Sequence, residues 1–318
     1  MGHVVSLGSV NVDRVRSVTG EEIAALRDRH EWFPERGETV RVDTVPDAFD
    51  DAVDRIEHGG KGANQAVAAA RADAEATLLG RVGTDEDRFG VREELVGAGV
   101  GVGHVETVAE PTGTAYVFVD AAGDSWILVR PGANGAVDEA YVRARYEHVV
   151  AADCLLLQNE IPVEPVRWLL DALADEPSRP TVILDPAPVE GVASLLSRDA
   201  VDYLVPNERE AAALGDALDA FEGTVVRTRG GDAITVEGDG DHGGFTVTPP
   251  AVTPVDTTGA GDVLNGYLGA RLAAGASLRA AIETAAVAAA LSTRRDGARR
   301  GVPTLAEVEA FERESKVR

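Results

Sequence analysis

The chain has 318 residues, of which 44% are hydrophobic, and its 54 acidic and 30 basic side chains give a formal net charge of −24. This length can bury a substantial core, and the negative field argues against nucleic acid and anionic membranes as partners. No stretch reaches the roughly 18 consecutive apolar residues of a membrane helix, and the N-terminus does not resemble a signal peptide, so we expect a soluble, cytoplasmic protein. Cys154 is the single cysteine and permits no intrachain disulfide.

The basic residues are unusual in kind. Lys61 and Lys316 are the two lysines, and all other basic residues are arginines. Acidic and apolar residues interleave along the chain, which argues against a disordered acidic segment. The composition is typical of a cytosolic protein adapted to high salt, where the Debye length falls to about 3 Å near 1 M and self-repulsion is screened. We therefore expect a halophilic protein.

Short apolar runs rich in valine, isoleucine and leucine recur, and segments with helical spacing separate most of them. The runs are HVVSLGSV, ATLLGRVG, CLLLQNE, TVILDPAP, DYLVPNE and TVVRTRGG, and the helical segments span residues 62–72, 85–98, 162–175 and 207–214. Buried strands that alternate with helices predict a parallel α/β sheet with helices on both sides. In such sheets ligands bind at the carboxyl ends of the strands.

Two regions depart from this pattern and predict a small β lid. Residues 111–130 predict a hairpin with a turn at Ala121–Asp124, and residues 36–58 are extended and charged. Both faces of the hairpin are apolar, with Ala115, Val117 and Val119 on one and Tyr116 and Phe118 on the other. Either a second subunit or the chain's own domain could cover them, and the pattern leaves both open. Residues 17–32 predict an inserted short helix.

The stretch VDTTGAGDVLNG, Val255 to Gly266, places glycines directly before a charged residue. Pro249–Val255 predicts a strand and Val263–Ala274 a helix, so Gly259–Gly261 would form the turn between them. Unpaired N–H groups at such a helix start favour an anion, including the charge of a transferring phosphoryl group. Asp262 beside the turn could accept a proton from an attacking hydroxyl, or it could merely cap the helix.

Three other polar stretches are weaker signals individually. GGKGANQAVAAARA, Gly59 to Ala72, resembles a phosphate-binding loop, but glycine follows Lys61 where that motif requires serine or threonine. Lys61 and Asn64 could donate to a polyhydroxy ligand, or the segment could be a glycine turn with a solvated lysine. NERE, from Asn207, has the spacing of a capping box, and TRGGD, from Thr228, is a turn signal.

In chain order, GSVNVD, GGKGANQAVAAAR, RPGAN, LDPAP, NERE, TRGG and DTTGAGD resemble the ribokinase-like family of carbohydrate kinases, the phosphofructokinase-B type, over nearly the whole chain. The resemblance implies a three-layer α/β/α sandwich with a mainly parallel central sheet. It implies one kinase domain, residues 1–318, with a β-sheet lid formed by about 12–58 and 104–130. The implied activity is ATP-dependent and uses Mg²⁺ to phosphorylate the primary hydroxyl of a pentose, ribose giving ribose 5-phosphate.

The resemblance also implies roles for individual residues. Asp262 would be the catalytic base, and Gly259, Ala260 and Gly261 would form the anion hole. Sugar contacts would come from Asn11, Asp13, Gly60, Lys61, Asn64 and Glu160. Nucleotide contacts would come from Asn207, Thr228, Gly230 and Gly261, and Glu210 would organise magnesium through water. Asp256, Thr258 and Gly297 would hold an activating potassium ion.

The chain departs from the family pattern in two places. The span from Asp13 to Gly59 is longer, through the insert at 17–32, and the tail RRDGARRGVP has an extra residue and Gly301 where a serine is usual. Ketohexokinase or fructokinase activity, nucleoside kinase activity and, in another class, non-catalytic sugar binding on the same fold therefore stay open. We expect a homodimer joined through the lid.

Overall fold

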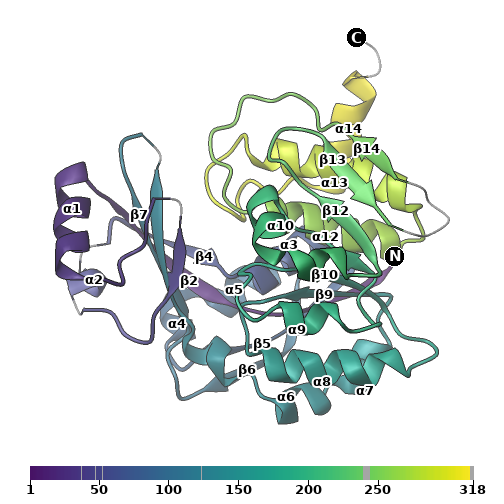
Figure 1. The fold of residues 1–318 in the computed structure, drawn as a ribbon, viewed down its shortest axis with the longest axis horizontal. Helices are drawn as coiled ribbons and strands as arrows, with labels where there is room; N and C mark the ends of the chain where they lie inside the picture. Colours follow the sequence, from purple (N-terminus) through teal and green to yellow (C-terminus); the bar gives the residue numbers. More distant parts are fainter. Residues whose placement is uncertain (37, 47, 52, 123, 239–243, 316–318) are drawn as a thin grey trace.

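The computed structural model describes residues 1–318 except 37, 47, 52, 123, 239–243 and 316–318. The described residues form a nine-stranded sheet and a five-stranded sheet to one side of it (Figure 1). In spatial order the larger sheet consists of β14 (Phe245–Val247), β13 (Ile234–Glu237), β12 (Thr224–Arg227), β11 (Tyr203–Leu204), β10 (Thr181–Asp185), β9 (Cys154–Gln158), β1 (His3–Leu7), β5 (Glu75–Gly83) and β6 (Gly101–Val108).

Neighbouring strands from β12 to β6 pair in parallel, and β13 and β14 pair antiparallel at one edge. Parallel strands are stable only when both faces are covered, and successive side chains of a strand point to opposite faces. In β1, Val4 and Val5 enter two different apolar clusters, and Leu156 and Leu155 of β9 divide in the same way. The continuous apolar runs of the sequence therefore supply two cores, one on each side of the sheet.

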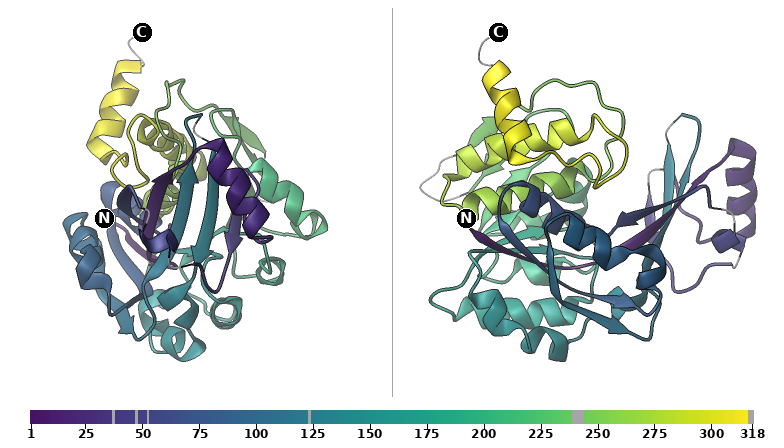
Figure 2. Two further views of the ribbon diagram at one scale, coloured as in Figure 1. Left: turned by 90° about the vertical axis from the view of Figure 1, so that its left-hand side faces the viewer. Right: turned by 180° about the vertical axis from the view of Figure 1, so that it is seen from behind.

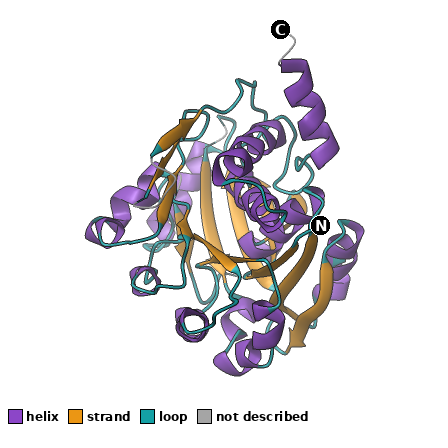
Figure 3. Ribbon diagram, turned by 90° about the vertical axis from the view of Figure 1, so that its right-hand side faces the viewer, coloured by secondary structure: helices purple, strands orange, loops and turns teal. Residues whose placement is uncertain are grey.

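Helices cover both faces, so the strands lie between two helical layers (Figure 3). One face packs against α3 (Lys61–Arg71), α5 (Val91–Gly97), α12 (Ala260–Ala273), α13 (Leu278–Ser292) and α14 (Leu305–Ser315). The other packs against α6 (Glu139–Arg143), α7 (Tyr146–Val150), α8 (Val163–Ala174), α9 (Ala193–Leu196), α10 (Glu208–Leu214) and α11 (Asp216–Asp219). The predicted three-layer α/β/α sandwich is confirmed.

Two predicted elements are wrong in detail. Pro249–Val255 is not a strand, because β14 ends at Val247 and the following segment carries three prolines, which have no N–H for a ladder. The helix predicted over residues 85–98 is two helices, α4 (Glu86–Phe89) and α5, because Gly90 adopts the left-handed conformation with φ of 65°.

The smaller sheet has the order β3 (Thr39–Arg41), β8 (Ser125–Arg130), β7 (Gly113–Val119), β2 (Asn11–Ser17) and β4 (Arg55–Gly59). We call it the lid. Its hairpin β7–β8 is antiparallel, as predicted, although position 123 of the predicted turn lies outside the described residues. The predicted lid boundary at residue 104 is wrong, because β6 pairs with β5 in the larger sheet and the second lid segment starts near Gly113.

The outer face of the lid is covered by the chain itself. The predicted insert forms α1 (Gly20–Arg29), which begins with a capping box at Thr19, and a short α2 (Ala48–Asp51) lies beside it. Both helices lie on the side of the lid that faces away from the larger sheet (Figures 1 and 2). Their region packs against four buried hairpin side chains, Tyr116, Phe118, Trp126 and Leu128. Covering by its own chain thus explains one of the two apolar faces.

The other face of the hairpin is less completely buried. Val117, Val119, Ile127 and Val129 are partly exposed there, whereas their neighbours on the outer face are buried. Across the described residues, no helix is both long enough and apolar enough to span a bilayer.

Candidate active site

The polar motifs meet at the carboxyl ends of the parallel strands. The segment after β1 leads to Asn11, the segment after β9 leads to Glu160, and β10 ends at Asp185. The N-termini of α3 and α12 lie at the same edge, since their first turns carry side chains that bond to one another. This is the position at which α/β sheets bind ligands.

Two glycines stand at the start of α12, which begins at Ala260, three residues before the predicted start at Val263, and each is required for a different reason. Gly259 is the N-cap residue with φ of 77°, and a Cβ there would lie 2.8 Å from Cβ of Ala298. Gly261 faces open space, with no atom within 4 Å of an added Cβ. The first N–H groups of a helix have no partner inside it, and the helix dipole adds positive potential. Gly259 is the N-cap and Ala260 and Gly261 are the first two residues of α12, so they stand where the predicted anion would meet these N–H groups.

Asp262 does not act as a helix cap. It is 5% exposed, and its two carboxylate oxygens accept hydrogen bonds from Asn64 Nδ2 (3.0 Å) and Gln65 Nε2 (3.2 Å) of α3. Burial raises the pKa of Asp262 to about 6, against the opposing effect of Lys61, and Asp185 raises it further. A carboxylate with that pKa is ionised near neutral pH and still basic enough to take a proton from a hydroxyl.

Lys61 joins two buried carboxylates. Its Nζ lies 3.0 Å from Asp185 Oδ2 and 3.8 Å from Asp262 Oδ1. Burial alone would lower the pKa of Lys61, but these carboxylates outweigh it and raise the pKa, so the ammonium stays charged. The prediction of a solvated lysine in a glycine turn does not describe this arrangement.

Asp185 is a site residue that sequence reasoning missed. Besides Lys61, its carboxylate accepts from Gln65 Nε2 (3.1 Å), Asn265 Nδ2 (3.3 Å) and the N–H of Ala187 (3.0 Å). The sequence signal was present in LDPAP, a polar residue at the end of an apolar strand. Which donors it would meet depends on α3 and α12, which are far from it along the chain.

The predicted sugar contacts converge at the start of β2. Asn11 Oδ1 accepts from Nδ2 of Asn134 (2.7 Å), which belongs to the 3₁₀ helix η1 (Gly132–Ala136) and was not predicted as a site residue. Oε2 of Glu160 accepts from the N–H of Lys61 (3.1 Å) and also contacts Ser9 Oγ. Gly60 has φ of 90° and packs against the backbone of residues 9–11, which leaves no room for a side chain.

Asp13 carries a buried acceptor with no partner. Its Oδ1 has no hydrogen bond within the described part of the chain, and an added Cβ on Gly59 would overlap the carboxyl. Burial raises the pKa of Asp13 to about 7, Arg299 opposes this, and the carboxylates of Glu160, Glu57 and Asp262 add to it. Because buried polar atoms in proteins are normally bonded, this oxygen fits a ligand hydroxyl.

The predicted nucleotide contacts lie side by side at the ends of β11 and β12. Asn207 and Thr228 form an isolated parallel bridge, and Gly230 follows at φ of 58° with open space around it. Asn207 and Glu210 also form a complete capping box at the start of α10. Burial, and then the nearby Asp185, raise the pKa of Glu210, which connects this half of the site to the Asp185–Asp262 pair.

The residues present fit a magnesium ion held mainly through water. Glu210 and Asp185 offer carboxylate oxygens, the ligand type that Mg²⁺ prefers. In the described ranges, no three His, Cys, Asp or Glu side chains are grouped closely enough to hold a metal themselves. Such a site suits Mg²⁺, which keeps several waters and binds substrate phosphates as well as one or two carboxylates.

The three residues predicted for potassium also lie together. The carboxylate of Asp256 accepts from the N–H of Thr258 (2.9 Å) and from the N–H of Gly297 (2.9 Å). Burial would raise the pKa of Asp256, but these hydrogen bonds outweigh burial and lower it, so the group is an anion. An ionised oxygen ligand behind the anion-binding turn is compatible with a monovalent cation.

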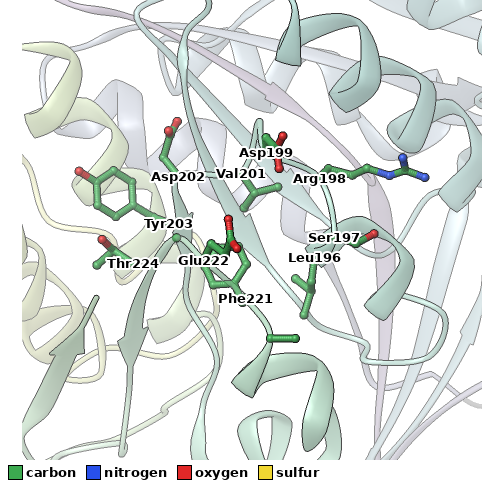
Figure 4. A pocket seen from close by; sticks show the side chains of 12 residues that line it. Leu196, Ser197, Arg198, Asp199, Val201, Asp202, Tyr203, Phe221, Glu222 and Thr224 are labelled. Carbon is green, nitrogen blue, oxygen red and sulfur yellow. The ribbon is translucent and has the colours of Figure 1, made fainter. Parts of the chain in front are cut away.

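Two hollows differ in their relation to the site. A cavity of about 640 Å³ lies at the amino ends of β11 and β12, lined by residues between Leu196 and Thr224 (Figure 4). Its Asp202 already accepts from Arg179 at 2.7 and 2.8 Å, and the cavity is at the wrong end of the strands to belong to the site. A hollow of about 380 Å³ between β3 of the lid and α10 reaches Glu210 and does adjoin the site.

Comparisons with known proteins identify relatives over nearly the whole chain. The model of the pfkB family of carbohydrate kinases matches residues 52–305. Among curated relatives, ribokinase of Bacillus subtilis is 36% identical over 97% of this chain and 99% of its own length, and ribokinase of Schizosaccharomyces pombe is 35% identical over 97% of each. Among solved structures, ribokinase of Thermotoga maritima is 29% identical with a TM-score of 0.79, covering 98% of this chain and 100% of its own.

The structure of Arabidopsis thaliana ribokinase complexed with ribose and ATP is 28% identical with a TM-score of 0.76, covering 98% of both chains. The family match spans most of the chain and includes the lysine, asparagine and aspartate that meet in the site. The predicted resemblance is confirmed: the chain belongs to the pfkB family of carbohydrate kinases.

Proposed function

We propose that this chain transfers the γ-phosphoryl group of ATP to the primary hydroxyl of ribose, giving ribose 5-phosphate and ADP. The observation that carries the proposal is Asp262, a buried carboxylate held by two amide side chains beside a glycine turn that favours anions. Sugar binding by itself needs no base of this kind. Full-length relatives named ribokinase support the choice of ribose.

Each side chain has one task in this reaction. Asp262 takes the proton of the hydroxyl as its oxygen forms the new bond to phosphorus and the bond to the ADP oxygen breaks. The turn Gly259–Gly261 stabilises the negative charge on the transferring group through its N–H groups. Lys61 adds positive charge beside Asp262, and Asp13 and Asn11 offer acceptors to sugar hydroxyls. Mg²⁺, held near Glu210 and Asp185, would supply charge neutralisation for the phosphates.

A phosphorylation screen tests the acceptor. The full chain is assayed with ATP, Mg²⁺ and molar KCl against ribose, deoxyribose, fructose and nucleosides, and the phosphorylated position is read by NMR. We expect ribose to have the highest kcat/KM, with phosphate on its primary hydroxyl. Turnover of a hexose or nucleoside alone would support the alternative kinases, and sugar binding without turnover would support a non-catalytic protein.

We also propose one kinase domain over residues 1–318 that dimerises through the lid. On the hairpin face that α1 and α2 do not cover, the side chains of Val117, Val119 and Ile127 are partly exposed in the isolated chain. This uncovered face is the basis for proposing the dimer. Sedimentation velocity in molar salt should show a dimer that a Val119→Glu variant converts to monomer. An active wild-type monomer would contradict the dimer. Cytoplasmic location stays a prediction.

Potassium activation and adaptation to high salt are proposed on separate grounds. The net charge of −24 implies strong self-repulsion in dilute buffer, which any molar salt relieves. The ionised Asp256 behind the anion-binding turn implies a specific cation, and oxygen cages can discriminate between cations. The two effects are separable because screening does not distinguish sodium from potassium.

A further inference from the structure

Arg299 is a buried arginine that the reaction described above does not use. It lies in the loop between α13 and α14, 235 residues from Asn64 along the chain, and is 7% exposed. Its Nε donates to Asn64 Oδ1 (2.8 Å), Nη2 donates to the carbonyl oxygen of Gly59, and Nη1 pairs with Glu94 (2.5 Å). The guanidinium thus spans α5, the glycine turn before α3 and the first turn of α3.

The contact with Asn64 fixes the direction of a carboxamide. A guanidinium has donors and no acceptor, so the group of Asn64 that faces Arg299 must be its oxygen. The amino group of Asn64 then points the other way, where it donates to Asp262 Oδ2 (3.0 Å). Arg299 therefore decides which end of Asn64 faces the base and the sugar pocket.

This constraint matters most after Asp262 has accepted a proton. A protonated carboxyl can donate as well as accept, so a free carboxamide could turn over and present its oxygen to Asp262. Arg299 prevents this because the reversed carboxamide would aim its NH₂ group at the guanidinium. Asn64 is thereby kept as a donor through the whole cycle.

The same loop also supports the anion-binding turn. Ala298 packs against Gly259, and the N–H of Gly297 bonds to Asp256. Arg299 follows directly and contacts the carbonyl of Gly59, next to the predicted sugar residues Gly60 and Lys61. One short segment is therefore in contact with both the phosphoryl half and the sugar half of the site.

We propose that Arg299 is a positioning residue that orients Asn64 toward Asp262 and the sugar and braces the turn at Gly59. The inference rests on the proposed sugar-kinase function and adds a determinant of sugar affinity to it. Arg299 acts through Asn64 and the backbone, and it is not itself a catalytic residue.

The test compares Arg299→Gln and Arg299→Lys with the wild-type chain in molar KCl, using the sugar that the wild type phosphorylates. Removing one partner of a buried, charged hydrogen bond leaves the other unsatisfied, so we expect kcat/KM for the sugar to fall about 10- to 100-fold in Arg299→Gln. The KM for ATP should change less than about twofold on this argument, because Arg299 bonds to none of the predicted nucleotide residues among the contacts described above. Arg295→Gln is the matched control: the same residue type in the same loop, exposed and paired with Glu307.

A pH profile and a double mutant add two readouts: the pH profile reports the charge of Arg299 near Asp13, and the double mutant reports its action through Asn64. Burial has the largest effect on the pKa of Asp13 and raises it, Arg299 lowers it, and Glu160, Glu57 and Asp262 add to the rise. Loss of the guanidinium should move the acid limb of kcat/KM for the sugar to higher pH in Arg299→Gln, less in Arg299→Lys, and not in Arg295→Gln. In an Asn64→Ala background, Arg299→Gln should add less than about a threefold loss, because the residue it orients is already absent.

Several outcomes would overturn the inference. They are a folded Arg299→Gln chain with wild-type sugar KM, equal losses for sugar and ATP, or full additivity with Asn64→Ala. If Arg299→Gln is recovered unfolded, the test uses Arg299→Lys, which keeps the positive charge but lacks the planar set of guanidinium donors. An unchanged sugar KM in Arg299→Lys would then contradict the inference. If the wild type binds sugar without phosphorylating it, the proposed kinase activity is refuted, and the role of Arg299 is then tested by calorimetric measurement of sugar binding. If the wild type binds no sugar, the proposed kinase activity and the proposed role of Arg299 are both refuted.

Discussion

Replacing Asp262 with asparagine tests the proposed chemistry at its centre. The side chain keeps its size, and its carbonyl oxygen can still accept from either Asn64 Nδ2 or Gln65 Nε2, which now bond to different carboxylate oxygens at 3.0 and 3.2 Å. Its NH₂ group must face the other donor, so one bond is lost, and the amide cannot take a proton. Loss of general-base catalysis lowers kcat by about 10²–10⁴, and we expect Asp262→Asn to fall in that range.

The pH dependence gives the same variant a second readout. Asp262 can act as a base only when its carboxylate is ionised, so the kcat of the wild type should fall as the pH decreases through about 6, the raised pKa of Asp262. Burial raises the pKa of Asp13 to about 7, so Asp13 should contribute a separate limb, which an Asp13→Asn variant identifies. The limb near pH 6 should be missing from the residual activity of Asp262→Asn.

The assay follows ADP release in molar KCl, with ATP and sugar binding measured by calorimetry. Asp216→Asn is the control, since Asp216 is an exposed aspartate in the first turn of α11, remote from the Asp262 contacts. Binding of both substrates should change only a few-fold in Asp262→Asn, in line with a loss confined to the transition state. A kcat near that of the wild type would refute the assignment of Asp262 as the base.

Three more predictions follow from the structure. Gly259→Ala should lower both Tm and kcat, because φ is 77° and the new Cβ would lie 2.8 Å from Ala298. The control is Gly275→Ala, at φ of 83° with open space, which should cost only the backbone strain of about 1–2 kcal/mol. Equal losses of Tm and kcat in the two variants would contradict the packing argument. In matched molar salts, NaCl should restore folding by circular dichroism while KCl is required for full turnover, and equal kcat values would refute the potassium site. The ring centroid of His148 lies 4.3 Å from that of His104 and 5.1 Å from that of His3, and burial and then these rings lower the pKa of His148. Protonation therefore favours the unfolded chain, so Tm should fall more steeply below about pH 6.5 in the wild type than in His148→Gln. Parallel Tm curves for the two chains would contradict this role of His148.

The layered fold could be predicted from the sequence, and so could the polar stretches that meet at the carboxyl ends of the strands. Val4 and Val5, or Leu155 and Leu156, must lie on opposite faces of a strand, so continuous apolar runs require cover on both sides. The glycines before Asp262 and the GGKGANQ stretch could be identified as candidate ligand-binding segments, because the features that mark them involve residues that are neighbours along the chain. Local pattern also predicted α1 and the β7–β8 hairpin.

Local pattern was misleading where a single residue altered the backbone. Gly90 divides one predicted helix into two, and the prolines after Val247 prevent a predicted strand from pairing. It was also incomplete for the hairpin, since nothing in residues 111–130 states that α1 would cover the face with Tyr116 and Phe118.

Whether the polar residues contact one another or only cap their own helices depends on contacts between distant parts of the chain. The sequence left open whether Asp262 caps its helix, whereas in the fold Asn64 and Gln65 of α3, nearly 200 residues away, donate to its carboxylate. Likewise, Lys61 and Asn265, which donate to Asp185, are distant from it along the chain. Arg299 carried no signal at all, because an arginine in a charged tail is ordinarily exposed. The physical reason is common to all three: the pKa of a carboxyl and the orientation of an amide depend on partners across space, and chain folding selects those partners.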